Sequence, residues 1–295
     1  MANYEPRTEI DALIPEKWTP FLQVPLYKSL VAVGQGGVAN TRLEPYLRDG
    51  QVINHSYIAM PDVIDYTPLT QEDGGISSYA AISATGETLI VNQAKVAPFY
   101  VERIENLQIK DGINPMEEQG KRAGYKLKDV IDTHVLAETL NGTVWNVTDV
   151  LSKSNIIDFA AEARKKLREA NVEEDGNWIM VVDPLAAQYI ELAATEKGFS
   201  VVDSTLRNGY AGNFMGFRIF VSNNLPDAST GTGKAYYIGK PGSIDLVMQT
   251  EPKMDISKAE DAIEGYKFKP YTIFGTKVFT EGKSRFLCAN TNLAS

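Results

Sequence analysis

Two histidines are the first candidates for chemistry in this sequence, because imidazole readily acts as a base or a metal ligand near neutral pH. His55 falls in a predicted loop and His134 on a predicted helix, and neither belongs to an HExxH or Cys/His pattern. A site would need carboxylates or a thiol that converge on one of them. We therefore predict structural roles for both, and neither a catalytic nor a metal site.

Two glycine-rich segments could be phosphate-binding loops. In residues 231–234, Gly-Thr-Gly-Lys, the lysine precedes Ala235 where Ser or Thr should stand, and no glycine lies five positions before Gly233. Residues 34–37, Gly-Gln-Gly-Gly, lack a convincing preceding strand and a following amphipathic helix. We predict a surface turn at the first segment, a hinge at the second, and no bound cofactor.

Four acidic residues cluster in one predicted loop. Asp62, Asp65, Glu72 and Asp73 give this loop a negative tip, which could bind a cation or a basic neighbour. A solvated turn explains the same residues more simply, and we favour that interpretation.

The composition is that of an ordinary folded protein. The 295 residues are 43% hydrophobic and 23% charged, and no apolar run approaches the ~20 residues that span a bilayer. The opening residues lack a basic start and an apolar core, so no secretory signal is predicted. The single cysteine, Cys288, agrees with a reducing cytoplasm and is expected to be a small buried side chain.

The charge argues against a nucleoprotein. Asp and Glu outnumber Lys and Arg by 38 to 29, which gives a formal net charge of −9 without a basic tail or cluster. Tight binding to nucleic acid phosphates requires a positive surface. We expect neither tight DNA binding nor a membrane partner.

The strongest helix prediction covers about residues 114–141. Asn114 is the candidate N-cap, Pro115 suits the first helical position, and Gly142 follows the last turn. The charged residues, including Asp129 and Asp132, mostly lie off the apolar stripe. That stripe contains Ala123, Leu127, Val130, Ile131, Ala137 and Leu140. A second amphipathic helix is predicted from Asn155 to about Ala170, with Ser154 as its cap.

The segment from Trp178 to Pro226 predicts a strand, a helix and a second strand. The first strand ends at Val182, and Asp183 with Pro184 opens the helix. The expected helix face contains Leu185, Tyr189 and Leu192, and Gly198 suits the stop. Phe217, Ile219 and Val221 alternate as in a half-buried strand. Further strands are predicted within residues 51–60, 87–92, 96–109, 266–269, 271–280 and 284–289, with a turn at 71–75.

The run VVDP, a helix, a glycine-rich turn and GFRIFVSNNLP together resemble the axial domain of major capsid proteins of tailed double-stranded DNA bacteriophages. Encapsulins and the herpesvirus capsid floor share that fold. The resemblance implies an α+β fold with an N-terminal arm (1–48), an extended β-hairpin loop (49–95) and a peripheral domain with a long spine helix (96–152). An axial α/β domain (153–250) and return strands of the peripheral domain (251–295) follow.

This resemblance implies a structural protein and not an enzyme. Copies would assemble through pentamers and hexamers into an icosahedral shell around double-stranded DNA, in the host cytoplasm and then in the virion. A scaffolding protein and a portal protein are implied partners, and the sequence leaves a decoration protein open.

The resemblance also assigns roles to three sets of residues. Those buried against neighbouring copies would be Trp18, Phe21, Leu22, Tyr57, Ile58 and Tyr66. The hinges would be Gly34, Gly36, Gly37 and Gly50. The axial tip loop would contain Arg207, Asn208, Gly209 and Tyr210.

Two absences refine the expected assembly. Some members join their subunits by a bond between a lysine of the extended loop and an asparagine, but no lysine lies between Lys28 and Lys95 here. We expect a shell without covalent crosslinks. Some relatives begin with a long helical scaffolding segment that a protease removes. The short arm here predicts a separate scaffolding protein and no N-terminal cleavage.

Two other functions remain as alternatives. An encapsulin-type compartment would have the same fold and enclose enzymes. Neighbouring genes would distinguish it from a phage capsid, because encapsulin genes lie beside genes of cargo enzymes. A soluble α/β enzyme would use the alternation within residues 154–221 as βαβ units, but it lacks a phosphate loop, a nucleophile elbow and paired catalytic residues.

Overall fold

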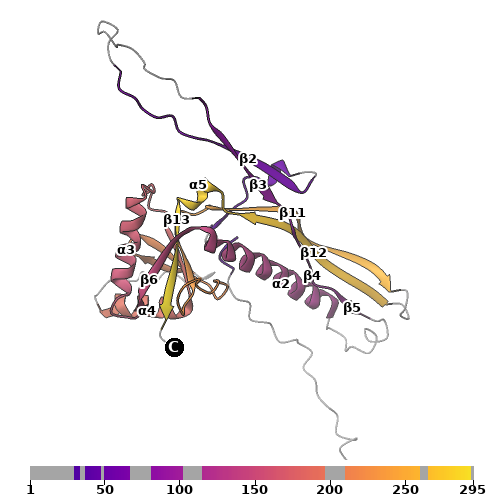
Figure 1. Ribbon diagram of the computed structural model, residues 1–295. Coiled ribbons are helices and arrows are strands. Elements are labelled where there is room, and N and C mark those ends of the chain that lie inside the picture. Colours follow the sequence, from indigo (N-terminus) through magenta and orange to yellow (C-terminus); the bar gives the residue numbers. More distant parts are fainter. Residues whose placement is uncertain are drawn as a thin grey trace, which may run out of the picture.

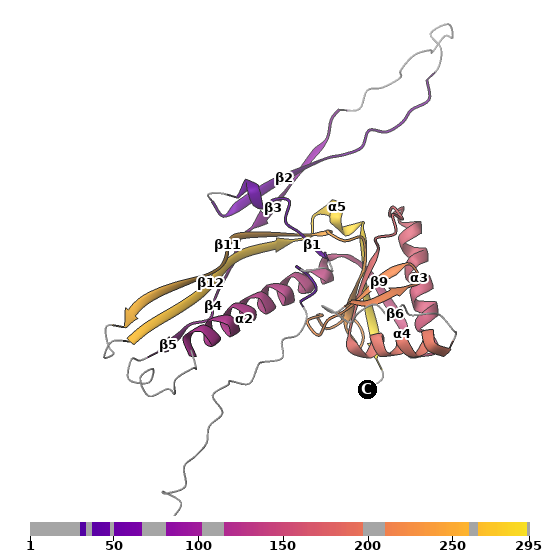
Figure 2. The ribbon, with the colours of Figure 1, turned by 180° about the vertical axis from the view of Figure 1, so that it is seen from behind.

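The computed structural model describes residues 30–33, 37–47, 50–66, 81–101, 115–196, 210–259 and 265–293. These residues form two units of sheet and helix, and a β-hairpin projects from one of them (Figure 1, Figure 2). The mixed content confirms the α+β class. Several predictions lie outside the described residues: those for Trp18, Phe21, Leu22, Gly34, Gly36, Glu72, Asp73, Asn114, Gly198, Arg207, Asn208 and Gly209.

The first unit is a long antiparallel ribbon covered by the long helix. Strands β11 (Ile244–Ala259) and β12 (Gly265–Lys277) pair along almost their whole length. Short strands complete the sheet: β1 (Ala39–Asn40) pairs with β11, while β4 (Gln93–Val96) and β5 (Phe99–Val101) pair with β12. The two strands predicted at 266–269 and 271–280 are therefore one.

The long helix α2 (Pro115–Ala137) lies along one face of this sheet and continues as η3 (Glu138–Asn141). Its start at Pro115 and the burial of Ala123, Leu127 and Ile131 confirm the prediction. The prediction that Asp129 and Asp132 lie off the buried side is wrong, since both are buried. Leu140, expected on the buried stripe, is instead exposed. The cause of this burial is tertiary: residues 30–33 and the segment around Asn224 enclose the second half of α2.

The second unit is a six-stranded sheet in the order β6-β13-β10-β7-β9-β8. The strands are β6 (Thr143–Leu151), β7 (Ile179–Val182), β8 (Tyr210–Phe214), β9 (Phe217–Val221), β10 (Ala235–Gly239) and β13 (Phe286–Leu293). The sequence-based division assigns β6 to 96–152 and β13 to the return strands. In the structure the two pair in parallel within this sheet, so neither belongs to the long sheet.

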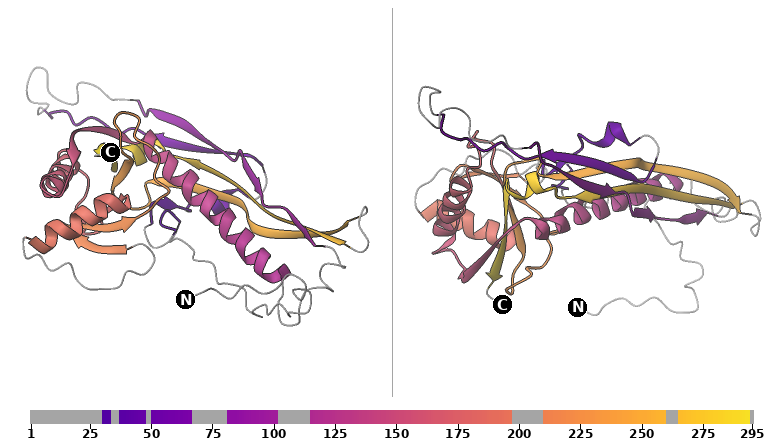
Figure 3. Two further views of the ribbon diagram at one scale, coloured as in Figure 1. Left: turned by 90° about the horizontal axis from the view of Figure 1, so that it is seen from below. Right: turned by 45° about the horizontal axis from the view of Figure 1, so that its top comes forward.

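Helices α3 (Ile156–Glu169) and α4 (Pro184–Glu196) pack in this unit (Figure 3). Asp183 caps α4 as predicted, because its Oδ1 accepts the N–H of Ala186 at 3.1 Å. The predicted face of α4 is wrong: Leu192 is exposed, and the buried face consists of Ala186, Ala187, Ile190, Ala193 and Ala194. Small side chains let the helix approach its neighbours closely. The Ser154 cap is also wrong, since Asn155 holds the N-cap position of α3.

The projecting hairpin consists of β2 (Val52–Ile58) and β3 (Ala84–Ile90), which pair without a register shift from Val52↔Ile90 to Ile58↔Ala84. Its root lies on a small core beside η2 (Glu44–Tyr46) and α5 (Thr280–Lys283). The residues of that core are Leu43, Leu47, Ile53, Leu89, Val91, Val247 and Phe279. Beyond the root, the hairpin extends away from both units (Figure 1).

Candidate functional site

The outer part of the hairpin exposes large apolar side chains that no part of the described chain covers. Val63 is 99% exposed and Met60 is 88% exposed. Ile58 and Tyr66, two of the predicted interface residues, are exposed as well, whereas Tyr57 is half-buried. The full set of exposed side chains is Ile58, Met60, Val63, Ile64, Tyr66 and Ile82. Contiguous exposed apolar surface is typical of a site that another macromolecule covers.

The root of the same hairpin is firmly held. The Glu87 carboxylate accepts the backbone N–H of Thr280 at 3.0 Å and also the hydroxyl of that residue. These hydrogen bonds lower the pKa of Glu87, and nearby Lys277 and Lys283 contribute in the same direction. Lys277 also donates from Nζ to the carbonyl of Thr88 at 2.6 Å. The hairpin is therefore held firmly at its root, and its outer half is apolar.

Two of the four predicted hinge glycines are described, and both have backbone angles that favour glycine. Gly37 has φ of 61° and Gly50 has φ of 109°. The carbonyl of Gly37 accepts the N–H of Gly242 at 2.5 Å, which ties this segment to the turn before β11. Movement about these glycines stays a prediction.

A buried carboxylate joins three parts of the molecule. Oδ1 of Asp132, on α2, accepts the backbone N–H groups of Val31 at 2.8 Å and of Ala32 at 2.7 Å. Its Oδ2 accepts the side-chain amide of Asn224, which follows β9, at 2.9 Å. The same amide nitrogen donates to Asp129 at 3.0 Å, and Lys126 pairs with Asp129 at 3.2 Å. The arm segment, the long helix and the six-stranded unit thus meet at one side chain.

Burial also changes the acidity of the carboxylates here. It raises the pKa of Asp132, and the charge of Asp129 adds to the rise, while the three hydrogen bonds oppose it. A second buried carboxylate, Asp245 at the start of β11, has its pKa raised by burial too. Arg42, next to β1, partly offsets that rise through an ion pair of 3.1 Å.

Sequence reasoning misses the junction around Asp132. The apolar stripe assigns Asp129 and Asp132 to the charged side of an amphipathic helix, and Asn224 is interpreted only as part of a strand stop. One signal is available: apolar residues in the second half of α2, such as Val135 and Leu136, are not confined to one stripe. A helix enclosed on several sides must place some polar residues in the interior.

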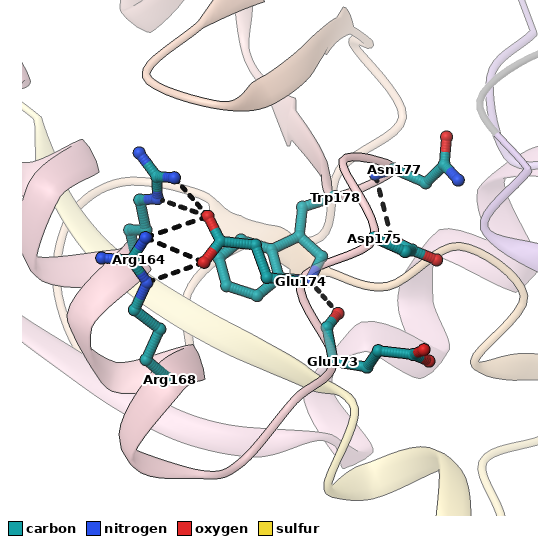
Figure 4. A network of polar contacts seen from close by, with 7 residues as sticks. All are labelled: Arg164, Arg168, Glu173, Glu174, Asp175, Asn177 and Trp178. Atoms are coloured by element: carbon teal, nitrogen blue, oxygen red, sulfur yellow. Dashed lines mark hydrogen bonds and ion pairs between the residues drawn. The ribbon is translucent and has the colours of Figure 1, made fainter.

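A second polar cluster stabilises the corner between α3 and β7 (Figure 4). The Glu174 carboxylate accepts hydrogen bonds from Arg164 and Arg168, and these bonds lower the pKa of Glu174. Trp178, at the start of the buried strand, donates from its indole Nε1 to the carbonyl of Glu173 at 2.9 Å. Each charged group has a partner within the unit, which favours a structural role.

The residues first considered for chemistry take structural positions. The rings of His55 and His134 pack against Phe279 and Phe274, and burial lowers the pKa of His134. Cys288 is buried, which raises the pKa of its thiol to about 11. Residues 231–234 form a turn in which Lys234 pairs with Asp227 at 2.6 Å. Of the predicted tip loop, only Tyr210 is described, as the first residue of β8.

Neither a metal site nor a membrane helix occurs in the described part of the chain. Its His, Cys, Asp and Glu side chains form no group of three or more that could hold a metal ion. Its helices are all too short or too polar to span a bilayer.

Comparison with known proteins relates this arrangement to viral shells. A model of the phage capsid protein family matches residues 87–286. A structure from Mycobacterium phage Che8 is 24% identical with a TM-score of 0.76, over 95% of this chain and 98% of that one. The capsid structure of the cyanophage P-SCSP1u is 13% identical with a TM-score of 0.72, over 100% of both chains. The mature capsid of bacteriophage PhiM1 is 14% identical with a TM-score of 0.64, over 94% and 92%. No curated protein matches the sequence.

Proposed function

Because the chain belongs to the phage capsid protein family, it is a structural protein of the virion shell and not an enzyme. We propose that copies of it assemble through pentamers and hexamers into an icosahedral shell that encloses double-stranded DNA without binding it tightly. The observation that carries this proposal is the rigidly mounted hairpin whose outer half exposes six large apolar side chains.

In an isolated monomer the apolar side chains of this hairpin remain in contact with water, which is unfavourable. Exposed side chains such as Met60 and Val63 gain about 25 cal/mol for each Å² of apolar area that a neighbour covers. Placing the hairpin of one copy on a different patch of the next gives a heterologous contact, and heterologous contacts generate rings. Tyr57, Ile58 and Tyr66 of the hairpin, with Trp18, Phe21 and Leu22 of the arm, are the proposed interface residues.

The two units of the structure correspond to two proposed domains of the capsid subunit. We assign the long sheet and α2 to the peripheral domain and most of the six-stranded unit to the axial domain. Residues 207–210 would then form the tip loop at the ring centre. Gly34, Gly36, Gly37 and Gly50 are the proposed hinges between arm, hairpin and helix, and Gly37 and Gly50 already hold positive φ angles.

The remaining features of the assembly are proposed from the sequence and from the family. No lysine lies between Lys28 and Lys95, a range that includes the whole hairpin. The mature shell is therefore proposed to lack covalent crosslinks that start from a hairpin lysine. A separate scaffolding protein is proposed, because the prolines and glycines within residues 1–48 disfavour a long scaffolding helix in this part of the sequence. A portal protein is a further proposed partner. Assembly takes place in the host cytoplasm.

Negative-stain microscopy and sedimentation velocity of the purified protein test the proposal, with and without the protein encoded just upstream. Shells, tubes, or free pentamers and hexamers are expected. A compact monomer or dimer at high concentration under both conditions contradicts the proposal. A ladder of high-mass species on SDS gels of mature particles contradicts the absence of crosslinks, and enclosed enzymes instead of DNA would favour the encapsulin-type alternative.

A further inference from the structure

A hollow lies between residues 30–33, the helix α2 and the strand β11. Its volume is about 390 Å³, which is large enough to receive whole side chains. Val33 at its rim is 42% exposed, and most of the lining is apolar. The lining residues are Leu30, Val33, Lys128, Ile131, Asp132, Met248, Glu251 and Pro252. Apolar surface of this kind gains free energy when other apolar groups cover it.

The hollow forms where β11 departs from regular pairing. The register of β11 with β12 shifts between Met248 and Thr250 and again between Thr250 and Lys253. Such bulges bend a strand, and Pro252, which lies in this interval, has no N–H for the ladder. The bent part of β11 therefore forms one wall of the hollow, and α2 forms the opposite wall.

The buried carboxylate of Asp132 lies at the inner end of the hollow. Its side chain is fully buried, and its Oδ1 accepts the N–H groups of Val31 and Ala32. Hydrogen bonds to a charged group become stronger when water is excluded around them. Side chains that fill the hollow would therefore also strengthen the attachment of residues 30–33 to α2.

The rim of the hollow carries an uncompensated negative charge. Glu251 is exposed there, and its charge adds to the effect of burial in raising the pKa of Glu44. Within the described part of the chain, neither of these two carboxylates forms an ion pair. Lys128 is the cation that lines the hollow, so two carboxylates face one ammonium group at this edge. An occupant that brings a further cation would be favoured.

The sequence directly before Leu30 has both kinds of side chain. Residues 25–29, which lie outside the described residues, read Pro-Leu-Tyr-Lys-Ser. In an extended chain alternate side chains share a face, so Leu26 and Lys28 would share the face of Leu30, whereas Tyr27 would point away. Four residues span up to about 14 Å, which is enough for Leu26 to reach a hollow whose wall includes Leu30.

We propose that the hollow is the seat for Leu26 and Lys28 of the same chain. Leu26 and the methylene stem of Lys28 cover the apolar lining, and the ammonium group of Lys28 pairs with Glu251. A lysine commonly buries its stem in this way while its charge stays in water. Residues 26–33 then form a strap that closes over Asp132.

The strap fixes the point at which the arm leaves the body of the protein. Residues 1–25 remain available to neighbouring copies, and this part contains Trp18, Phe21 and Leu22. A single copy can form the strap, so the inference does not depend on the proposed function. Protein that forms the strap but never forms shells would contradict the proposed function alone.

Hydrogen exchange of the unassembled full-length protein tests the seat. Leu26→Asp should speed exchange of the amides of Val31 and Ala32 by about tenfold, because a charged group leaves the hollow open to water. Tyr27→Asp is the matched control, since it adds the same charge on the other face, and exchange should stay within about twofold of wild type. Equal effects of the two variants, or no effect of either, overturn the proposal.

Charge reversal and rescue test the ion pair. Lys28→Glu should speed the same exchange by about threefold to fivefold, and adding Glu251→Lys should restore it to within about twofold of wild type. A double variant that exchanges faster than Lys28→Glu alone contradicts the pairing.

Crosslinking identifies the chain that supplies the strap. A mixture of ¹⁴N- and ¹⁵N-labelled protein is treated with a carbodiimide, which joins amines to carboxylates in contact. A crosslink between Lys28 and Glu251 within one copy is expected. Mixed-isotope crosslinks would place the strap of a neighbouring copy in the hollow, and Glu251 joined only to other lysines would leave the hollow without Lys28. Either result overturns the proposal.

Discussion

The carboxylate of Asp132 and the side-chain amide of Asn224 are joined by a hydrogen bond of 2.9 Å, although 92 residues separate them in the chain. Both residues are buried, and the amide nitrogen of Asn224 divides its two hydrogens between Asp132 and Asp129. The contact links the long helix to the six-stranded unit at the point where the arm segment is bound. The contact therefore adds a polar link to the hydrophobic core that the two units share.

Replacing Asn224 by alanine should destabilise the protein by about 2–4 kcal/mol, because two buried carboxylates each lose a donor. Urea unfolding followed by tryptophan fluorescence measures the change. Gln188→Ala, an exposed position on α4, is the control and should stay within about 0.5 kcal/mol of wild type. Equal stability of the two variants would show that the junction contributes nothing.

Asp132 should also leave a signature in the pH dependence of stability. Its folded-state pKa is raised above 3.8, so the folded state binds the proton more tightly than the unfolded chain does. Its contribution is complete below pH 3.8 and is lost as the pH rises through the raised value. The unfolding free energy of wild type minus that of Asp132→Asn should therefore fall as the pH rises from about 4 to 7. A difference that rises over this range would reverse the assigned sign.

Asp183 forms hydrogen bonds with both a helix and a strand. Its carboxylate caps α4 through the N–H of Ala186 and also accepts the hydroxyl of Tyr236, a fully buried residue of β10. Asp183→Ala should cost about 2–4 kcal/mol, since it removes the cap and takes the carboxylate acceptor from a buried hydroxyl. Tyr236→Phe removes only the hydroxyl and should cost less, about 1 kcal/mol. Thermal unfolding of both variants checks the order, which a larger loss for Tyr236→Phe would contradict.

Gly275 sets how closely the hairpin root approaches the long sheet. An added Cβ would lie 2.5 Å from the carbonyl oxygen of Ile90 and 2.9 Å from Cα of Val91, so backbone must shift. Gly275→Ala should destabilise by about 1–3 kcal/mol and speed hydrogen exchange in β2 and β3. Gly86→Ala is the matched control in the hairpin itself, because a Cβ atom added there would meet nothing within 4 Å. Unchanged exchange in Gly275→Ala would show that the root does not depend on this contact.

The thiol of Cys288 should be inert in the native protein. Burial raises its pKa to about 11, and the thiolate is the reactive form. Iodoacetamide at pH 8 should leave the folded protein unmodified and label it fully in urea, as measured by intact mass. Rapid labelling without denaturant would place Cys288 at an accessible position.

Signals that depend on neighbours in sequence predict the start of α2 and the cap of α4 correctly, although the Ser154 cap is an exception. Pro115 at the start of α2 and Asp183 as a cap each act within one or two turns of chain. The alternation predicted for Phe217, Ile219 and Val221 is only partly right, because Phe220 is buried as well and Val221 is half-buried. Errors arise where distant segments decide the environment, as for Asp132, for the buried alanine face of α4 and for the pairing of β6 with β13. An interface role for the exposed hairpin residues Ile58 and Tyr66 is predicted from the family resemblance alone. Which side chains share a face of the long sheet cannot be read without the strand register, because residues of β11 and β12 become neighbours only through pairing.

The position of β13 has a consequence for synthesis of the protein on the ribosome. This strand lies inside the six-stranded sheet, between β6 and β10, although it is formed by residues 286–293. Until those residues have left the exit tunnel, β6 has no neighbour and the remaining four strands stay separate from it. A chain that terminates early therefore lacks a complete unit, while its hairpin can already form. Completion of the six-stranded sheet therefore waits for residues 286–293, which are the last of its residues to be synthesised.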